Sequence, residues 1–345
     1  MVRLKDIAVK AGVTEATVSY VLNGRHEQHH ISEKTCLKVR EIAKKLGYYF
    51  DDIARAMATG KTNAIGFIAR ETTYEFVAAI LTGAMKEAAE NNYFIKLLNY
   101  HDEITADEII QICMKQRLSG LICYNLNYEI LNSLEKNLCH CGIPVAMCSN
   151  GLVPESFVHV MTNDYQGGCL ATQYLCDLGH RKIAYVGNDS IQSYALDRKK
   201  GYIDTLKKNN IDLPSEFIFS SDRRETLIKF LSDNVLVRKD KPTAIICSSD
   251  WYASSVICFL QSNGIKVPSD ISVVGYGNLF SSEYSIPAIT TIAEPNIKLG
   301  AKTMEFILKK IKNKDMNITC AETLDIELIK RASTALVKNN ERCNQ

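Results

Sequence analysis

The sequence predicts an α/β protein with a small all-α head, a hinge helix and a two-lobed core of parallel sheets flanked by helices. Three observations lead to this prediction. In the first 48 residues, apolar side chains recur every three or four positions, which is a helical period. From Ile65 onward, short apolar runs rich in β-forming residues alternate with helical stretches, as is typical of parallel sheets covered on both faces. This alternation occurs in two series of similar size, which indicates two similar lobes.

The first two helices of the head are expected to form a tight pair. The first spans Leu4–Ala11 and ends at Gly12, a residue suited to a sharp turn between helices. Thr14 is positioned to cap the second helix, which ends at Asn23. Two helices joined by a glycine turn follow the helix-turn-helix plan, and the motif spans residues 4–23.

A third helix is expected to support this pair. It begins after Ser32, a residue type that caps helix N-termini, and ends at Gly47. Its apolar positions recur at helical spacing. The predicted buried stripe is Leu37, Val39, Ile42, Ala43 and Leu46.

Charge is distributed unevenly along the chain. Residues 1–61 contain eleven lysines and arginines against seven acidic residues, a net charge of +4. The whole chain has a net charge of +2, so the remainder carries −2. A basic head on a nearly neutral body is the electrostatic pattern expected of a nucleic-acid-binding module joined to a second module.

Cysteine and histidine do not indicate a metal site or a disulfide framework. Twelve cysteines are present, most of them in apolar segments, and none forms a C-x-x-C pair. Cys139-His140-Cys141 lacks the spacing of a zinc finger. The histidines between residues 26 and 30 are interpreted as part of a polar loop. We therefore expect reduced thiols, no metal and no cofactor.

The start of the chain and its hydropathy indicate a cytoplasmic protein without a membrane anchor. The first residues, M-V-R-L-K-D-I-A, lack the apolar region of a signal peptide, and no stretch has the ~18 uncharged apolar residues of a spanning helix. A Ser/His/Asp set, a Walker loop and G-x-G-x-x-G are also missing from the sequence. An enzyme is therefore not expected.

Motifs along nearly the whole chain closely resemble those of the LacI/GalR family of bacterial transcription regulators. The head segment L-K-D-I-A-V-K-A-G-V-T-E-A-T-V-S-Y-V-L-N-G is similar to the opening helix-turn-helix of that family. The segment G-Y-Y-F-D-D-I-A-R-A-M-A-T-G-K-T-N-A-I-G resembles its hinge. Further matches follow in the family's order: N-D-Y-Q-G-G, L-G-H-R-K-I-A-Y-V-G, D-R-K-K-G-Y, P-T-A-I-I-C-S-S-D, G-I-K-V-P-S-D-I-S-V-V-G-Y and P-A-I-T-T-I.

This resemblance implies a homodimer whose heads bind the half-sites of a palindromic operator in double-stranded DNA. A small-molecule effector would bind between the lobes of a core that is similar to periplasmic sugar-binding proteins. The implied domains are a head at 1–48, a hinge at 49–61 and a core at 62–338. The N-lobe would comprise about 62–161 plus 292–323, and the C-lobe about 162–291 plus 324–338.

The resemblance assigns operator reading to three residues of the second helix. Glu15 suits the N4 donor of cytosine, Ala16 suits a thymine methyl, and Tyr20 offers a phenolic donor on an apolar ring. Dipole compensation by Glu15 and partial burial of Tyr20 are the alternatives. Many family members have arginine where Tyr20 stands, so an altered half-site is expected. Phosphate contacts are assigned to Thr14, Thr17, Ser19, Asn23 and Ser32.

The hinge departs from the family pattern Y-x-P-N-x-x-A-R-x-L. Phe50 stands in place of the proline, Asp51 in place of the asparagine, and Met57 in place of the leucine. Met57 is apolar and flexible enough to insert into a minor-groove step. Ala54 is expected to allow close approach to DNA, and Arg55 to lie near the backbone. An ordinary linker helix is the alternative.

The predicted effector cleft lacks two carboxylates that sugar-binding members commonly have, because Ser149 and Gly277 occupy the matching positions. Arg198 matches the family's ligand-binding arginine, and Arg223 falls roughly where an aromatic residue often stacks on the sugar. The loss of two carboxylates and the gain of a guanidinium at Arg223 favour an anionic or amide-rich effector over a neutral hexose. The remaining candidates for the walls of the cleft are Tyr74, Phe76, Trp251, Ser249 and Asp250.

A transcription regulator, by family habit a repressor, is the function that these features favour. The alternative is a solute-binding protein of a transport or sensing system, which would need neither the head nor its basic charge. Control by a corepressor protein instead of a small molecule is a second alternative. The C-terminal tail has no leucine heptads, so a dimer without a tetramerising helix is expected. The sequence leaves open the operator, the regulated genes, the effector and the sense of its action.

Overall fold

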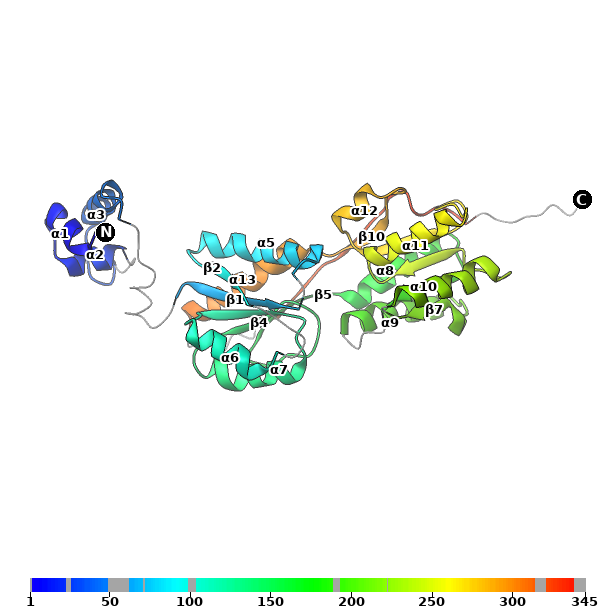
Figure 1. Ribbon diagram of the computed structural model, residues 1–345, viewed down its shortest axis with the longest axis horizontal. Coiled ribbons are helices and arrows are strands. Elements are labelled where there is room, and N and C mark those ends of the chain that lie inside the picture. Colours follow the sequence, from blue (N-terminus) through cyan, green and yellow to red (C-terminus); the bar gives the residue numbers. More distant parts are fainter. Residues whose placement is uncertain are drawn as a thin grey trace, which may run out of the picture. The chain divides into compact units, whose positions relative to one another are not determined.

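A computed structural model describes residues 2–22, 26–48, 62–70, 72–98, 104–188, 193–221, 223–313 and 321–337. The chain divides into two compact units, Met1–Thr62 and Asn63–Gln345. The first unit contains the predicted head at 1–48, and the second contains the α/β core (Figure 1).

In its described residues, 2–22 and 26–48, the head contains three helices with the predicted helix-turn-helix arrangement. α1 (Leu4–Ala11) ends at Gly12, whose φ of 70° is left-handed and whose N–H donates to two carbonyls of the last turn. Such a conformation is accessible to glycine at little cost. α2 is Glu15–Leu22, and α3 is Glu33–Lys45. Ser32 caps α3 by accepting a hydrogen bond from the Thr35 N–H, as predicted.

The hydrophobic core of the head corrects one predicted position. Leu37 is 62% exposed, whereas the preceding residue, Cys36, is buried together with Val39 and Ala43. Positions 36, 39 and 43 follow the three-and-four spacing of one helical face, and Leu37 is rotated off that face by about 100°. The prediction that Leu37 is buried is therefore wrong.

The first lobe of the core contains a parallel sheet with the strand order β11-β5-β4-β3-β1-β2 among the residues described. Its central strands are buried except for Tyr124 at the end of β3, so their sequences are nearly continuous apolar runs. The strands are β1 (Ala64–Ala69), β2 (Phe94–Leu97), β3 (Gly120–Tyr124), β4 (Val145–Met147), β5 (Val158–Thr162) and β11 (Ala321–Leu324).

The second lobe repeats this plan with the order β12-β10-β9-β8-β6-β7 in the described part of the chain. Its pairs are parallel except at one edge, where β12 runs antiparallel to β10. The strands are β6 (Ile183–Gly187), β7 (Ile218–Ser220), β8 (Ala244–Cys247), β9 (Ser272–Gly277), β10 (Thr290–Ala293) and β12 (Glu327–Ile329).

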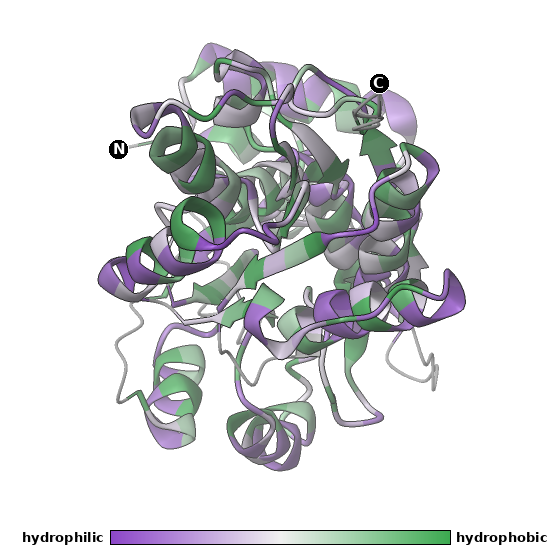
Figure 2. Ribbon diagram, turned by 90° about the vertical axis from the view of Figure 1, so that its right-hand side faces the viewer, coloured by the Kyte–Doolittle hydropathy of each residue, from purple (hydrophilic) through white to green (hydrophobic). Residues whose placement is uncertain are grey.

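Helices cover both faces of each sheet, which confirms the predicted fold class. In the first lobe, α5 (Glu75–Glu90) and α13 (Asn296–Lys312) cover one face, and α6 (Ala106–Lys115) and α7 (Tyr128–Leu134) cover the other (Figure 1). In the second lobe, α8 (Asp164–Asp177) and α9 (Ser193–Lys208) lie opposite α10 (Arg224–Leu231) and α11 (Asp250–Ser262). Figure 2 shows the strands mostly in the green of hydrophobic residues, whereas each helix carries both hydrophobic and hydrophilic residues.

Shorter helical turns complete the connections. A π-helical turn, Glu135–Cys139, extends α7, and another, Ser232–Val237, extends α10. A 3₁₀ turn, Ser215–Phe217, precedes β7, and α12 (Phe280–Tyr284) precedes β10.

Two glycines allow α5 and α13 to pack in close contact. A Cβ on Gly83 would lie 1.9 Å from the carbonyl oxygen of Ile297, and a Cβ on Gly300 would lie 1.8 Å from that of Ile80. No side chain fits at either distance, so the two helix backbones touch here. This contact joins the segment after β10 firmly to the first lobe.

The chain passes between the lobes at three places. The first crossing lies at Asn163, between β5 and α8, and the last lies between β11 and β12, next to the predicted boundary at 323/324. The predicted N-lobe resumes at residue 292, but β10 lies wholly in the second sheet and pairs with β9 and β12. The second crossing follows at Glu294-Pro295, so Ile292 belongs to the second lobe.

Candidate DNA-binding surface and ligand cleft

The outward face of α2 carries the predicted base-reading residues. Glu15 and Ala16 are exposed and Tyr20 is half-buried. On the opposite side of the helix, Val18 and Val21 are buried in the core of the head. The helix is therefore anchored by its valines and presents a small, weakly charged face to solvent.

Two of the hydroxyls that were assigned to phosphate contact also cap helices. Thr14 Oγ1 accepts a hydrogen bond from the Thr17 N–H at 3.1 Å and lies 2.9 Å from Thr17 Oγ1. Ser32 and Thr35 repeat this arrangement at the start of α3, at 3.3 and 2.9 Å. Each pair satisfies a backbone donor that the first turn of a helix leaves unpaired. Ser19 is half-buried on the same outward side as Tyr20.

Tyr20 has a neighbour that the sequence did not predict. The ring of His29 stacks on the ring of Tyr20, with 3.5 Å between centroids and 15° between planes. His29 comes from the turn between α2 and α3. Four other predicted DNA contacts, Asn23, Ala54, Arg55 and Met57, lie outside the described residues, as does the hinge at 49–61.

In the core, Arg198 of α9 lies in a buried cluster of charges where the chain crosses between lobes. Its Nε donates to Asp164 Oδ1 at 2.6 Å, and its Nη2 donates to Glu294 Oε1 at 2.7 Å. Its Nη1 donates to the carbonyl of Ser248 at 2.9 Å, and the guanidinium lies 3.6 Å from the ring centroid of Tyr276. Arg198 therefore joins the two segments that follow β5 and β10.

The charge of this cluster does not support the prediction of an anionic effector. One buried guanidinium faces two carboxylates, Asp164 and Glu294. Burial raises the pKa of Glu294 to about 7, although Arg198 acts in the opposite direction. Each nitrogen of the Arg198 guanidinium donates to a protein acceptor, and two of these acceptors are carboxylates, so Arg198 by itself does not indicate a positive cleft. The sequence missed Glu294 because its partner is 96 residues away.

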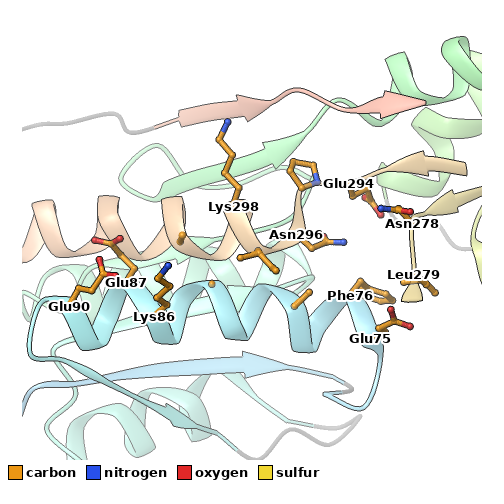
Figure 3. Close-up of a pocket in the computed structure, with 16 residues that line it drawn as sticks. Glu75, Phe76, Lys86, Glu87, Glu90, Asn278, Leu279, Glu294, Asn296 and Lys298 are labelled. Atoms are coloured by element: carbon orange, nitrogen blue, oxygen red, sulfur yellow. The ribbon is translucent and has the colours of Figure 1, made fainter. Parts of the chain in front are cut away.

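A pocket of about 630 Å³ lies where α5, the start of α13 and the end of β9 meet (Figure 3). Of the predicted residues, it brings together Phe76 and Gly277. Phe76 stacks with Tyr74, at 5.5 Å between ring centroids, and Tyr74 is 57% exposed. The charged residues of the lining are four acids and two lysines: Glu75, Glu87, Glu90, Glu294, Lys86 and Lys298.

Three other predicted ligand contacts have structural partners. Ser149 Oγ accepts a hydrogen bond from the backbone N–H of Asn125 at 3.1 Å. Ser249 caps α11. Asp250 is fully buried and accepts hydrogen bonds from the Thr291 hydroxyl at 2.6 Å and from the Leu279 N–H at 2.8 Å. Asp250 therefore fixes the loop after β9 that lines the pocket.

Arg223 lies apart from these residues. It is exposed at the start of α10, where its N–H donates to Ser221 Oγ at 3.2 Å, and it does not line the pocket. Trp251 is also 57% exposed. Among the described residues, no group of three or more His, Cys, Asp or Glu side chains could hold a metal ion, and no helix is long and apolar enough to cross a membrane.

Comparison with known proteins decides the family. Residues 3–51 match the model for bacterial regulatory proteins of the lacI family, and residues 172–334 match a periplasmic binding protein-like domain. The HTH-type transcriptional repressor PurR of Vibrio vulnificus is 30% identical over 318 residues, which cover 91% of this chain and 93% of that protein. The chain belongs to the LacI family of bacterial regulatory proteins.

Solved structures support the same fold for this LacI-family protein. The Lac repressor dimer bound to operator and the anti-inducer ONPF has a TM-score of 0.78 at 23% identity and covers 97% of this chain and 99% of its own. A LacI family regulator from Enterococcus faecalis with bound ribose has a TM-score of 0.68 at 25% identity, with coverage of 80% and 100%. The protein is thus a DNA-binding transcription repressor with a two-lobed core.

Proposed function

We propose that this LacI-family repressor binds a palindromic operator as a homodimer, with one head on each half-site, and that a small molecule in the cleft controls binding. The observation that carries the proposal is the outward face of α2, which presents Glu15, Ala16 and Tyr20. The opposite face of this helix is buried in the core of the head through Val18 and Val21. The N-terminal residues of a recognition helix are those that contact base edges in the major groove.

The composition of this face predicts a specific kind of reading. Glu15 accepts hydrogen bonds, Ala16 offers a methyl group, and Tyr20 offers a phenol, so the face has no arginine to pair with guanine. Phosphate contacts would come from the capping hydroxyls and the surrounding lysines, which fix register without reading sequence. The half-site should therefore differ from that of relatives with arginine at the position of Tyr20.

Selection of binding sites tests this proposal. The purified protein is incubated with a randomised duplex library at a stated salt concentration, because phosphate contacts make affinity depend on salt. A palindromic site should emerge, and the variant Y20A should change the preference at specific base pairs. Recovery of non-palindromic sequences, or of the same preferences with Y20A, would contradict the proposal.

The dimer would use an exposed apolar surface on the second lobe. Trp251 of α11 is 57% exposed, and Phe280 and Tyr284 of α12, which contact each other, are 69% and 65% exposed. Clustered exposed aromatic residues are typical of interaction sites. Sedimentation analysis should give a dimer for the full chain and a shift toward monomer for the variant F280D. A monomer at micromolar concentrations without substitution would contradict this part of the proposal.

For the effector, we propose a neutral or cationic polar molecule that donates hydrogen bonds. Glu294 lines the pocket next to Asn278, and the acids of the lining outnumber its lysines (Figure 3). Hydroxyl and amino groups are suitable donors to such acceptors. The ribose bound by the regulator from Enterococcus faecalis is a molecule of this kind.

Isothermal titration tests the effector class. Neutral pentoses and hexoses, amines and nucleobases form one panel, and sugar phosphates and dicarboxylates form the other. Binding should occur in the first panel and be weakened by E294A. Micromolar binding of an anion that survives E294A would contradict the proposal. If neither panel binds, control by a corepressor protein becomes the favoured alternative.

We also propose that the chain consists of a head at 1–48, a hinge at 49–61 and a core at 62–338. The protein would act in the cytoplasm, where bacterial operator DNA lies.

In the bound dimer, Met57 of the hinge would insert into the central minor-groove step, with Ala54 and Arg55 beside it. The variant M57A should therefore weaken binding to the operator more than binding to random DNA. An equal loss of affinity on both DNAs would contradict the insertion of Met57.

A further inference from the structure

We propose that His29 is a positioning residue for Tyr20 and, through it, a determinant of operator specificity. The inference rests on the proposed reading of bases by Tyr20. The two rings are stacked, with 3.5 Å between centroids and 15° between planes. His29 is exposed and Tyr20 is half-buried, so the pair lies at the surface of the head.

His29 is held by the backbone of its turn. The N–H of His30 donates to the carbonyl of Glu27 at 3.1 Å, and the N–H of Ile31 donates to the carbonyl of His26 at 2.9 Å. His30 has a φ of 51°, in the left-handed region. This pair of bonds around a left-handed residue is the arrangement that ends helices. It sets the direction of the backbone on both sides of His29.

The turn is also anchored to the rest of the head. Ile31 packs against the hydrophobic core of the head, and Ser32 begins α3. Tyr20 is flanked on α2 by Ser19 and by Val21, of which Val21 is buried. Both partners of the stack therefore extend from backbone that the head core holds in place. The stack joins two segments that a helix-turn-helix motif alone would leave unconnected.

A stacked ring restricts what the phenol can do. One face of the Tyr20 ring is covered by His29, so a base cannot stack on that face and must meet another part of the phenol, such as its hydroxyl. Restricting rotamers before binding lowers the entropy that is lost on binding. It also raises the cost of meeting the wrong base, since the phenol cannot turn toward another partner. The expected consequence is sharper discrimination at the base pair that Tyr20 contacts.

The test is a double-mutant cycle on the full-length protein with its selected operator. The variants are Y20A, H29A, the double variant and H29F, which keeps an aromatic ring at the position. Q28A is the matched control, because Gln28 is exposed in the same turn and has no ring to stack. Dissociation constants are measured on the operator and on operators with each single base pair substituted, at one salt concentration. Thermal unfolding of each variant verifies that the head remains folded.

H29A should reduce discrimination about two- to tenfold at the same base pair that Y20A affects, the range expected for an aromatic pair. H29F should restore it, Q28A should leave it unchanged, and the double variant should lose no more than Y20A alone. Losses that multiply in the double variant, or an equal loss by H29A at every base pair and on random DNA, would overturn the inference. If Y20A changes no base preference, base reading by Tyr20 fails instead, which separates the two results.

Discussion

Replacing Arg198 by methionine should destabilise the second lobe strongly. The substitution keeps a long apolar side chain but leaves Asp164 and Glu294 as buried carboxylates without their cation. It also removes the hydrogen bond to the Ser248 carbonyl and the stacking on Tyr276. Removing one partner of a buried ion pair costs about 3–5 kcal/mol, because an uncompensated charge stays behind.

The same result follows from the individual contacts. Each of the two hydrogen bonds between Arg198 and a carboxylate, at 2.6 and 2.7 Å, contributes about 1.5–3 kcal/mol. Together the two hydrogen bonds contribute about 3–6 kcal/mol, a range that includes the cost of about 3–5 kcal/mol for breaking a buried ion pair. By contrast, K182M removes an ion pair to Asp240 whose side chains are 50% and 62% exposed. That control should cost less than about 1 kcal/mol.

The loss of stability caused by R198M should depend on pH. Burial raises the pKa of Glu294 from about 4.5 to about 7, so between these values the folded chain holds a proton that the unfolded chain has released. The contribution of Glu294 to the free energy of unfolding therefore falls as pH rises from 4.5 to 7. Arg198 lowers the pKa of Glu294, so its removal extends this fall to higher pH. The penalty of R198M should be larger at pH 8 than at pH 5.5.

Urea unfolding followed by tryptophan fluorescence measures the effect. Trp251 is the only tryptophan of the chain and lies in α11, in the same lobe as Arg198. The neutral triple variant R198M/D164N/E294Q should recover much of the lost stability, because no buried charge remains. A cost for R198M no larger than that of K182M, or a triple variant as unstable as R198M, would refute the reasoning.

Three further predictions concern single positions. G83A should lower stability by about 1–3 kcal/mol in thermal unfolding, because its Cβ would overlap the carbonyl of Ile297, and an unchanged melting temperature would contradict the close packing. S32A should cost the head about 1 kcal/mol, measured by circular dichroism, whereas S32D should retain the cap. Burial lowers the pKa of His180 below its ordinary value of 6.5, so stability should fall as pH drops below 6.5, and H180Q should flatten that profile.

The local features of the head could be predicted from the sequence because they depend on neighbouring residues. The left-handed glycine at position 12 and the cap at Ser32 each involve residues within a few positions. The predicted stripe differs from the structure at one place, where Cys36 is buried and Leu37 is exposed. Free cysteine is among the most buried residue types and can take a core position that leucine also suits.

The lining of the candidate pocket could be predicted only in part. Phe76 and Gly277 line the pocket, but Arg223 does not, and Ser249 and Asp250 cap and brace the loops around it. A side chain at a strand end has several partners within reach, and its sequence position does not decide among them. The resemblance named residues around this pocket, and only the structure shows which of them line it.

The sequence by itself determined the three-helix head, the two α/β lobes and the family, because periodicity, caps and ordered motifs are properties of short segments. Only the tertiary structure decided the partners of Arg198 and the stacking of His29 on Tyr20. Both depend on bringing together residues that no local pattern relates. The contacts of Arg198 also showed that its guanidinium is paired with two buried carboxylates, which its position in the sequence does not reveal.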